Sequence, residues 1–232
     1  MSGIDLAKRA AAEAAARLVE SGMVVGIGSG STVRWLIEAL GRRVREQGLR
    51  IVGVPTSAET DALALHHGIT LAEPDGTPID LAIDGADEVE RGTLRLIKGL
   101  GGALLREKII AQAARRFVVI ADARKVVDTL GERAPVPVEV ARFGHGATAR
   151  RLADLGARPV LRRVQGETVF VTDGGNVIYD CAGFAPIRDP FTLQRELYAI
   201  AGVIETGMFL ECATSALIAA ADGSVTTMER LR

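Results

Sequence analysis

Residues 97–110, reading IKGLGGALLREKII, place a lysine, a run of glycines and a glutamate close together in the chain. Lys98 precedes three glycines within four residues, and Glu107 lies in a helical pattern of apolar residues that begins at 103. Glycines at a strand-to-helix junction leave backbone N–H groups open to an anion, and the helix start adds partial positive charge. A cation, open amides and a carboxylate within about 10–15 Å of chain could bind an anion and move a proton. A glycine-rich turn before a surface helix with solvated charges is the alternative interpretation.

A second glycine-rich stretch, GIGSGST at 26–32, lies where a buried run gives way to an amphipathic one. The dinucleotide fingerprint G-x-G-x-x-G would need a glycine where Ser31 or Val33 stands, and no GK[ST] of a P-loop follows. The pattern instead suits a single phosphate monoester at a helix N-terminus, with a capped helix after a tight turn as the alternative. The groups available to hold the phosphate are the backbone and hydroxyls of Ser29, Gly30, Ser31 and Thr32.

Two carboxylates lie at the end of the apolar run LAID, in the order Asp84-Gly85-Ala86-Asp87. They could hold sugar hydroxyls, or one of them could act as a general acid or base. Because Glu88 and Glu90 follow, a divalent metal is a further alternative, but the spacing is not that of an EF-hand and no histidine joins the group. An Asx turn with solvated acids also fits this pattern.

Alternating apolar and amphipathic runs supply the scaffold for these loops. We expect strands at 23–28, 50–56, 69–74, 81–90, 93–97 and 117–122, and helices at 5–20, 33–46, 57–68 and 103–116. Such alternation predicts an α/β fold, in which a parallel sheet is covered on both faces and ligands bind at the carboxyl ends of the strands. The loops expected at those ends are 28–32, 84–87 and 98–102.

The pattern changes after about residue 130, where short strands and a turn signal at 172–176 (TDGGN) interleave with helices near 146–155 and 191–199. This predicts a second, smaller α+β domain at 132–202. Residues 203–232 are strand-like again, and we expect them to return to the first sheet. The main domain would then comprise 1–131 plus 203–232.

Composition excludes several classes of protein. A net charge of −1 and 4% aromatic residues give no reason to expect a nucleic-acid partner, and no apolar run approaches 18 residues, so no membrane partner is expected. Asp5, Glu13 and Glu20 interrupt the Ala- and Arg-rich N-terminus, unlike a transit peptide, so we predict a cytoplasmic location. Neither the two cysteines nor the three histidines have metal-ligand spacing, and no zinc site is predicted.

The loops together describe a site for a small, anionic, polyhydroxylated molecule, with a phosphate cradle, two acids for a diol, one lysine and one glutamate. ADARK at 121–125 repeats the acidic form at the end of a further apolar run, with Lys125 as a phosphate partner or a solvated lysine. No redox cofactor motif and no nucleophilic serine or cysteine elbow is present. Proton transfer is the chemistry that remains.

Five segments resemble the signature segments of ribose-5-phosphate isomerase, type A: GIGSGST, DGADEV, KGLGGALLREKI, ADARKVVD and TDGGNVIYD. They occur in that family's order and, with Lys8, extend to Asp180. The resemblance implies a Rossmann-like main domain with a small ferredoxin-like α+β domain. It also implies interconversion of D-ribose 5-phosphate and D-ribulose 5-phosphate in the non-oxidative pentose phosphate pathway, through an enediol(ate), without metal or cofactor, by a homodimer or a tetramer.

The resemblance also assigns roles to residues of this chain. Glu107 would be the base that moves the proton between C1 and C2. Asp84, Asp87 and Lys98 would handle ring opening and the oxygens near the reacting carbons. The substrate would be lined by Ser29, Gly30, Ser31, Thr32, Gly85, Ala86, Gly99, Leu100 and Gly101, with Lys8 and Lys125 as basic partners of the phosphate.

The glycine loop departs from the family's usual KGGGAAL, because Leu100 replaces a glycine and Gly102 replaces an alanine. A positive φ at Leu100 would force this loop to reshape. Two other classes of function stay open. One is a sugar-phosphate sensor that binds without turnover, which the intact acid and base residues disfavour. The other is a different enzyme on a similar scaffold, such as an amino-sugar phosphate deaminase or a CoA transferase; the deaminase would want a catalytic histidine near the acids.

Overall fold

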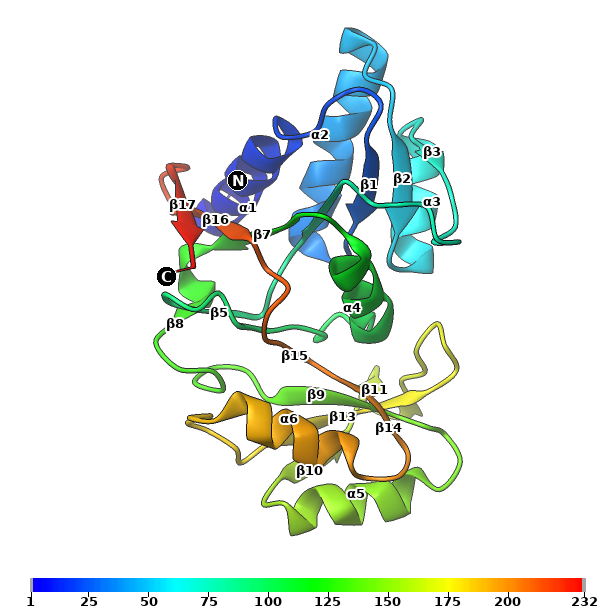
Figure 1. The fold of residues 1–232 in the computed structure, drawn as a ribbon, viewed down its shortest axis with the longest axis vertical. Helices are drawn as coiled ribbons and strands as arrows, with labels where there is room; N and C mark the ends of the chain where they lie inside the picture. The colour runs from blue at the N-terminus through cyan, green and yellow to red at the C-terminus, as the bar shows by residue number, and fades with distance from the viewer. Residues whose placement is uncertain (1, 231–232) are drawn as a thin grey trace.

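The computed structural model describes residues 2–230. Its largest sheet has seven strands and forms the centre of the larger of its two parts (Figure 1). All neighbouring strands are parallel except the edge strand β17, which pairs antiparallel with β16. The predicted parallel α/β sheet is therefore confirmed. In sheet order the strands are β17 (Val225–Glu229), β16 (Ser215–Ala219), β7 (Phe117–Asp122), β4 (Leu81–Asp84), β1 (Val24–Ile27), β2 (Val52–Pro55) and β3 (Thr70–Leu71).

The two faces of this sheet are buried in separate cores, because successive side chains of a strand point to opposite faces. Val25 and Ile27 of β1 lie in the core that helices α1, α2 and α3 cover, whereas Val119 and Ala121 of β7 lie in the core beneath α4. Both faces are covered, as predicted. The helices are α1 (Gly3–Ala16), α2 (Ser31–Gln47), α3 (Ala58–His66) and α4 (Leu104–Ala113).

Four very short strands form a second sheet on the side of the main sheet that α4 covers. Two of the strands predicted from the sequence, 81–90 and 93–97, were therefore wrong in extent. The chain turns between β4 and β5, so 81–90 is two strands rather than one. Leu94 has φ 56°, and the strand expected at 93–97 is reduced to two residues that pair antiparallel with β5. The loop at 98–102 therefore follows a strand of this second sheet, not of the main one. Its strands are β15 (Met208–Phe209), β6 (Leu96–Ile97), β5 (Glu88–Glu90) and β8 (Val126–Val127).

A smaller α+β unit has an antiparallel sheet of four strands in the order β10-β13-β9-β14. The TDGGN turn reverses the chain between Val171 and Val177, which form an isolated antiparallel bridge. The two helices, α5 and α6, are near the predicted positions. The elements are β9 (Val136–Val140), α5 (His145–Asp154), β10 (Arg158–Leu161), β11 (Arg163–Val164), β12 (Thr168–Val169), β13 (Val177–Ala182), α6 (Pro190–Tyr198) and β14 (Val203–Thr206).

The expected return to the main sheet at residue 203 is wrong for the first strands of that segment. Strand β14 pairs with β9 of the small sheet, and β15 pairs with β6 of the second sheet. Only β16 and β17 belong to the main sheet. These short strands look alike in sequence, and partners distant in the chain decide which sheet each one joins. The division of the chain into two domains stays a prediction.

Helix α4 lies between the main sheet and the small sheet (Figure 1). One side of it contributes Ile110 and Ala111 to the core of the main sheet. The other side places Lys108 against Glu205 and Thr206 of β14. Within residues 2–230, none of the helices combines the length and the apolar composition that a bilayer crossing requires.

Candidate active site

The predicted loops meet in a cleft of about 290 Å³ at the carboxyl ends of β1, β4 and β7, which are neighbours in the main sheet. All of the predicted site residues except Asp84 and Leu100 line this cleft, and Asp122 and Arg124 line it in addition. Asp84 lies just beneath the lining, with 3% of its surface exposed. The ends of β1, β4 and β7 bring together loops that are distant in sequence, as parallel-sheet geometry predicts, whereas Lys98, Gly99 and Gly101 reach the cleft from β6 of the second sheet.

Three buried charged side chains form the floor of the cleft. Lys98 Nζ lies 2.9 Å from Asp84 Oδ2 and 3.2 Å from Glu107 Oε2. It also donates a hydrogen bond of 2.7 Å to the Gly85 carbonyl. Lys98 and Glu107 are only 3% and 5% exposed. Such burial makes each charge depend on its neighbours, because water no longer screens it.

Glu107 differs from its neighbours in how it is held. Among residues 2–230, its Oε2 is the single buried side-chain polar atom without a hydrogen bond. Asp84, by contrast, accepts backbone N–H groups of Ser29 at 3.1 Å and Gly85 at 2.7 Å. Oε2 therefore has the Lys98 ammonium as an ionic neighbour at 3.2 Å but, among the described residues, no hydrogen-bond donor of the kind that Asp84 has. A buried polar atom without a hydrogen bond carries a desolvation cost, which a ligand at the same place can relieve. Glu107 is the less firmly held of the two carboxyls.

The three groups influence one another's protonation. Burial, together with the nearby charge of Asp84, raises the pKa of Glu107 to about 8, although Lys98 pulls it down. Burial also raises the pKa of Asp84, against the opposing effect of Lys98. For Lys98, burial acts to lower the pKa, but the two carboxylates outweigh it and hold the pKa above its ordinary value. Backbone donors from Ser29 and Gly85 stabilise the anion of Asp84, and no such donor contacts Glu107 Oε2 in the described part of the chain.

Gly28 follows directly after β1, in the segment whose glycines do not match a dinucleotide fingerprint. A Cβ added at Gly28 would lie 2.0 Å from Asp84 Cγ, so only glycine lets the Asp84 side chain lie against this strand end. The glycine pattern of 26–32 therefore provides room for a carboxylate. The next glycine, Gly30, has φ 97° and forms the N-cap of α2.

The start of α2 supplies groups suited to an anion. No side chain caps this helix, so the N–H groups of its first turn are open at the cleft. Ser31 and Thr32 line the cleft here, and Lys8 of α1 donates a 2.9 Å hydrogen bond to Ser31 Oγ. Helix α4, which also begins at the cleft and carries Glu107, likewise has no side-chain cap. Both helix starts add positive potential to the cleft.

Ser29 lines the cleft, but its hydroxyl is held by other hydroxyl groups. Ser29 Oγ lies 2.8 Å from both Thr56 Oγ1 and Ser57 Oγ, and 3.3 Å from Thr60 Oγ1. Thr60 in turn donates to the carbonyl of Gly28 at 2.8 Å. This cluster ties the loop at 28–32 to the N-terminus of α3. Ser57 is also the N-cap of α3, because its Oγ accepts the Thr60 N–H.

The glycine loop at 98–102 accommodates Leu100 without reshaping. The positive φ values fall at Gly99 (103°) and Gly102 (88°), and Leu100 is not among the non-glycine residues with positive φ. The Leu100 N–H donates to Asp87 Oδ2 at 2.9 Å, and its side chain is 42% exposed. Its side chain is not part of the cleft lining, while its backbone holds the predicted residue Asp87 in place.

Basic side chains lie on the rim at the end of β7. Lys125 Nζ is 3.9 Å from Asp87 Oδ1, and Arg124 pairs with Asp122, its Nε 2.7 Å from Oδ1. Sequence reasoning singled out Lys125 but missed Arg124 and Asp122, although all three stand in the ADARK segment at a strand end. The place of Asp122 and Arg124 at the end of the same strand as Lys125 was the sequence signal that could have identified them.

The described residues hold no cluster of three or more His, Cys, Asp or Glu side chains suited to a metal ion. The acids at and after the end of β4 have different contacts. Asp84 pairs with Lys98, whereas Glu88 accepts backbone N–H groups of Gly131, Arg133 and Ala134. Glu88 therefore stabilises a loop of the small unit rather than joining the acids of the cleft.

Comparison with known proteins identifies the family. The family model described as ribose 5-phosphate isomerase A (phosphoriboisomerase A) matches residues 52–223. The chain belongs to the ribose-5-phosphate isomerase A family. A ribose-5-phosphate isomerase A from Gluconobacter oxydans is 57% identical over 227 residues, covering 96% of this chain and 97% of that protein. One from Thermomicrobium roseum is 50% identical over 231 residues, covering 99% and 96%.

Solved structures of this family have the same fold. The ribose 5-phosphate isomerase A of Methanocaldococcus jannaschii superposes with a TM-score of 0.91 at 41% identity, covering 97% of this chain and 98% of that one. A D-ribose-5-phosphate isomerase solved in complex with phospho-erythronic acid superposes with a TM-score of 0.93 at 39% identity, covering 98% and 99%. The fold expected from the family resemblance is thereby confirmed.

Proposed function

We propose that this protein interconverts D-ribose 5-phosphate and D-ribulose 5-phosphate by proton transfer at Glu107. The observation that carries the proposal is the buried Glu107 carboxyl, which lacks a hydrogen bond and lies 3.2 Å from the buried ammonium of Lys98. A base beside a fixed cation is what an enediolate intermediate requires, because negative charge develops on oxygen as the proton leaves carbon. Membership of the isomerase family supports the choice of substrate.

The proposed reaction starts from the open-chain aldose. Ionised Glu107 removes the proton from C2, the C1–C2 double bond of the enediolate forms, and the charge that develops on O1 lies toward Lys98. Glu107 then returns a proton to C1, while the hydroxyl proton of O2 passes to O1, which gives the ketose. Asp84 and Asp87 would serve ring opening and hold hydroxyls near the reacting carbons. Every proton and electron pair is retained, so the step needs no cofactor.

The phosphate end of the substrate is assigned to the start of α2. Open amides at an uncapped helix N-terminus, the Ser31 and Thr32 hydroxyls, and Lys8 gather there. Lys125 on the rim is the second basic partner that we propose. A relative solved with phospho-erythronic acid, a phosphorylated polyhydroxy acid, supports a ligand of this chemical class.

Turnover of D-ribose 5-phosphate with excess EDTA tests this function, using wild type, Glu107→Gln and the control Glu196→Gln, an exposed residue of α6. We expect activity in wild type and the control, and a loss of at least about 100-fold in Glu107→Gln, since a general base contributes about 10²–10⁴-fold. Full activity in Glu107→Gln would refute the assigned base. Activity abolished by EDTA would point to a metal at the acidic turn.

Binding without turnover would favour the alternative, a sugar-phosphate sensor. Calorimetric titration of wild type with D-ribose 5-phosphate distinguishes the two, because a sensor binds the sugar and leaves the aldose unchanged. The pathway, the cytoplasmic location and assembly as a homodimer or tetramer stay predictions. Light scattering of the purified protein would test the assembly.

A further inference from the structure

Arg162, at the end of β10 in the small unit, reaches across to the glycine loop of the cleft. Its Nη1 donates hydrogen bonds to the carbonyls of Gly99 at 2.7 Å and Leu100 at 3.1 Å. Its Nε donates to Asp180 Oδ2 at 3.0 Å, and its Nη2 donates to Asp180 Oδ1. The side chain is 11% exposed, and these four hydrogen bonds together with the neighbouring Phe170 ring hold the guanidinium in a fixed orientation.

This contact holds the peptide groups of the loop from the side opposite the main sheet. The Leu100 N–H is bonded to Asp87, and the Leu100 carbonyl is bonded to Arg162, so both polar groups of this residue are fixed. The Gly99 carbonyl accepts both Arg162 and the N–H of Gly102. In the described part of the chain the N–H groups of Gly99 and Gly101 have no acceptor, and both glycines line the cleft.

Phe170 closes the same side of the loop. Gly102 has φ 88°, and an added Cβ there would lie 2.3 Å from Phe170 Cζ. Phe170 also lies beneath Arg162, whose Cζ is 5.8 Å from its ring centroid. The small unit therefore presents a fitted surface to the loop, which leaves the loop few alternative backbone conformations.

We propose that Arg162 is a positioning residue of the isomerase site: by holding the Gly99 and Leu100 carbonyls outside the cleft, it keeps the loop N–H groups and Lys98 directed toward the substrate. The proposal rests on the proposed function, and it assigns a role in that site to the small unit. A displacement of about 1 Å in catalytic groups can cost about 100-fold in rate, so a loosened loop should show in turnover.

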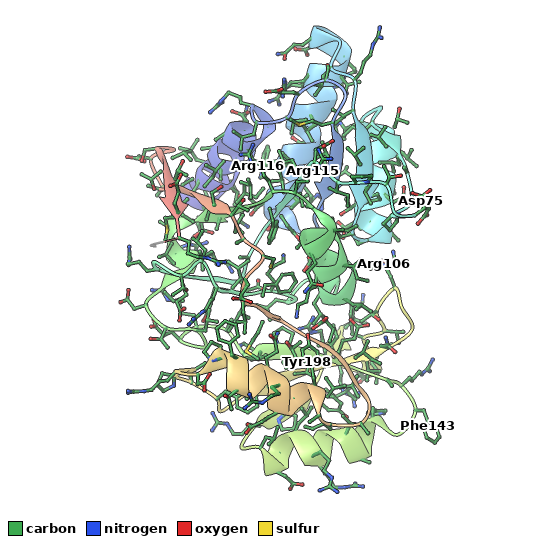
Figure 2. The ribbon with its side chains drawn as sticks, viewed as in Figure 1. Asp75, Arg106, Arg115, Arg116, Phe143 and Tyr198 are labelled. Atoms are coloured by element: carbon green, nitrogen blue, oxygen red, sulfur yellow. The ribbon has the colours of Figure 1, made fainter. Side chains whose placement is uncertain are left out.

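Other contacts already join the two units, so Arg162 is not needed to hold them together. Asp173 in the TDGGN turn accepts the Ala58 N–H at 2.9 Å and Arg106 Nη1 at 3.2 Å. Figure 2 shows Arg106 extending from α4 on the side of this turn. Lys108 joins α4 to Glu205 of β14 at 2.5 Å. Loss of Arg162 should therefore loosen the loop and leave the units docked.

The test compares Arg162→Met and Arg162→Lys with Arg163→Met. Arg163 is the neighbouring, exposed arginine, and within residues 2–230 its side chain donates only to the Glu167 carbonyl. For Arg162→Met we expect kcat to fall by about 10–100-fold while KM changes by less than about threefold, because the phosphate end is untouched. Arg162→Lys should recover part of kcat, and Arg163→Met should match wild type.

Hydrogen exchange of the peptide that covers residues 98–104 supplies a readout that does not depend on activity. We expect faster exchange there in Arg162→Met, with unchanged exchange across β9 and β13. Asp180→Asn, which weakens the hold on the guanidinium, should change kcat and exchange in the same direction, and it serves if Arg162→Met does not fold. Adding it to Arg162→Met should cause no further loss.

Equal kcat and equal loop exchange in Arg162→Met and Arg163→Met would overturn the proposal. So would a loss of kcat accompanied by faster exchange throughout the small sheet, which would show a purely structural role. If wild type does not isomerise ribose 5-phosphate, the proposed function fails. The hold of Arg162 on the loop is tested separately, and unchanged loop exchange in Arg162→Met would refute it.

Discussion

Glu107 and Lys108 are adjacent in α4 but contact different surroundings. Glu107 faces the cleft and lacks a hydrogen bond at Oε2, whereas Lys108 donates to Glu205, the Thr206 carbonyl and Tyr198. Successive residues of a helix are about 100° apart, so neighbours can serve separate purposes. A carboxyl held by one ion pair and no hydrogen bond is suited to chemistry, and a lysine with three acceptors is suited to holding elements together.

The raised pKa of Glu107 predicts the pH dependence of turnover. The base must be ionised, and the pKa of about 8 implies that kcat/KM falls as pH drops through about 8. An ordinary glutamate would keep activity down to about pH 4.3. The rate of ketose formation between pH 5 and 9 measures this. A profile flat down to pH 5 would show that the carboxyl is ionised in the free protein.

The same carboxyl should make stability depend on pH. Because the folded-state pKa of about 8 exceeds the ordinary 4.5, Glu107 contributes its stability below about pH 4.5 and loses it as pH rises through about 8. From pH 5 to pH 9 the free energy of unfolding of wild type should therefore fall by at least about 1 kcal/mol relative to that of Glu107→Gln, since one pKa unit is worth about 1.4 kcal/mol. Urea unfolding of both proteins at pH 5 and at pH 9 measures this difference. Glu196→Gln should show no such trend.

The helices divide according to how they begin. In the described part of the chain, α1, α3 and α6 have side-chain caps from Ser2, Ser57 and Asp189. The two helices that start at the cleft, α2 and α4, have none, and α5 of the small unit, which begins after Gly144, has none either. Leaving these amides open costs local stability, because caps are worth about 1 kcal/mol each. The open amides are instead available to an anionic ligand.

Ser57 combines a cap with a contact to Ser29 in the loop that we propose to bind the phosphate, so its removal should have two effects. Ser57→Ala should destabilise the protein by about 1 kcal/mol, the usual cost of losing a cap. It also removes the 2.8 Å contact with Ser29, so we expect KM for the sugar phosphate to rise more than kcat falls. Thermal unfolding and steady-state kinetics measure the two effects.

Ser2→Ala is the matched control, because it removes the cap of α1, where Ser2 forms a capping box with Asp5. It should cost a similar free energy of unfolding and leave KM unchanged. Equal KM values for Ser57→Ala and wild type would mean that the Ser29 cluster has no effect on the phosphate loop.

At the scale of the whole molecule, α4 joins the main sheet to the small sheet through a buried ion pair. Lys108 Nζ lies 2.5 Å from Glu205 Oε1 and 4.9 Å from the Phe209 ring centroid. Figure 2 shows Tyr198, a further neighbour of Lys108, on α6 in the small unit. This cluster is 5% exposed at Lys108 and 12% at Glu205, so its charges have little access to water.

Removing one partner of this pair should therefore destabilise the fold. We expect Lys108→Met to cost about 3–5 kcal/mol in the free energy of unfolding, because the buried Glu205 carboxylate loses its counter-ion and keeps only the Tyr198 hydroxyl and the Thr206 N–H as donors. Folded Lys108→Met should keep most of its activity, since Lys108 does not line the cleft. Urea unfolding measures the cost. The double variant Lys108→Met/Glu205→Gln should recover part of this cost. If it recovers none, the cost does not come from the buried charge of Glu205.

The sequence by itself determined the α/β class, the positions of the loops and nearly the whole cleft lining. Apolar periodicity and glycine placement are local patterns, and parallel strands bring their carboxyl ends to one edge wherever they occur. Family signature segments added the roles of Glu107, Lys98 and the acids. These roles stay proposals, although the geometry supports them.

Only the tertiary structure decided which residues hold those groups. The strands β5, β6, β8 and β15 are two or three residues long and have no periodicity to read, so their sheet was missed and the assignment of β14 was wrong. The raised pKa of Glu107 arises from burial by elements distant in the chain. Arg162 gave no signal, because an arginine at a strand end is ordinarily solvated. Its contact with the glycine loop depends on two units meeting, which no local pattern encodes.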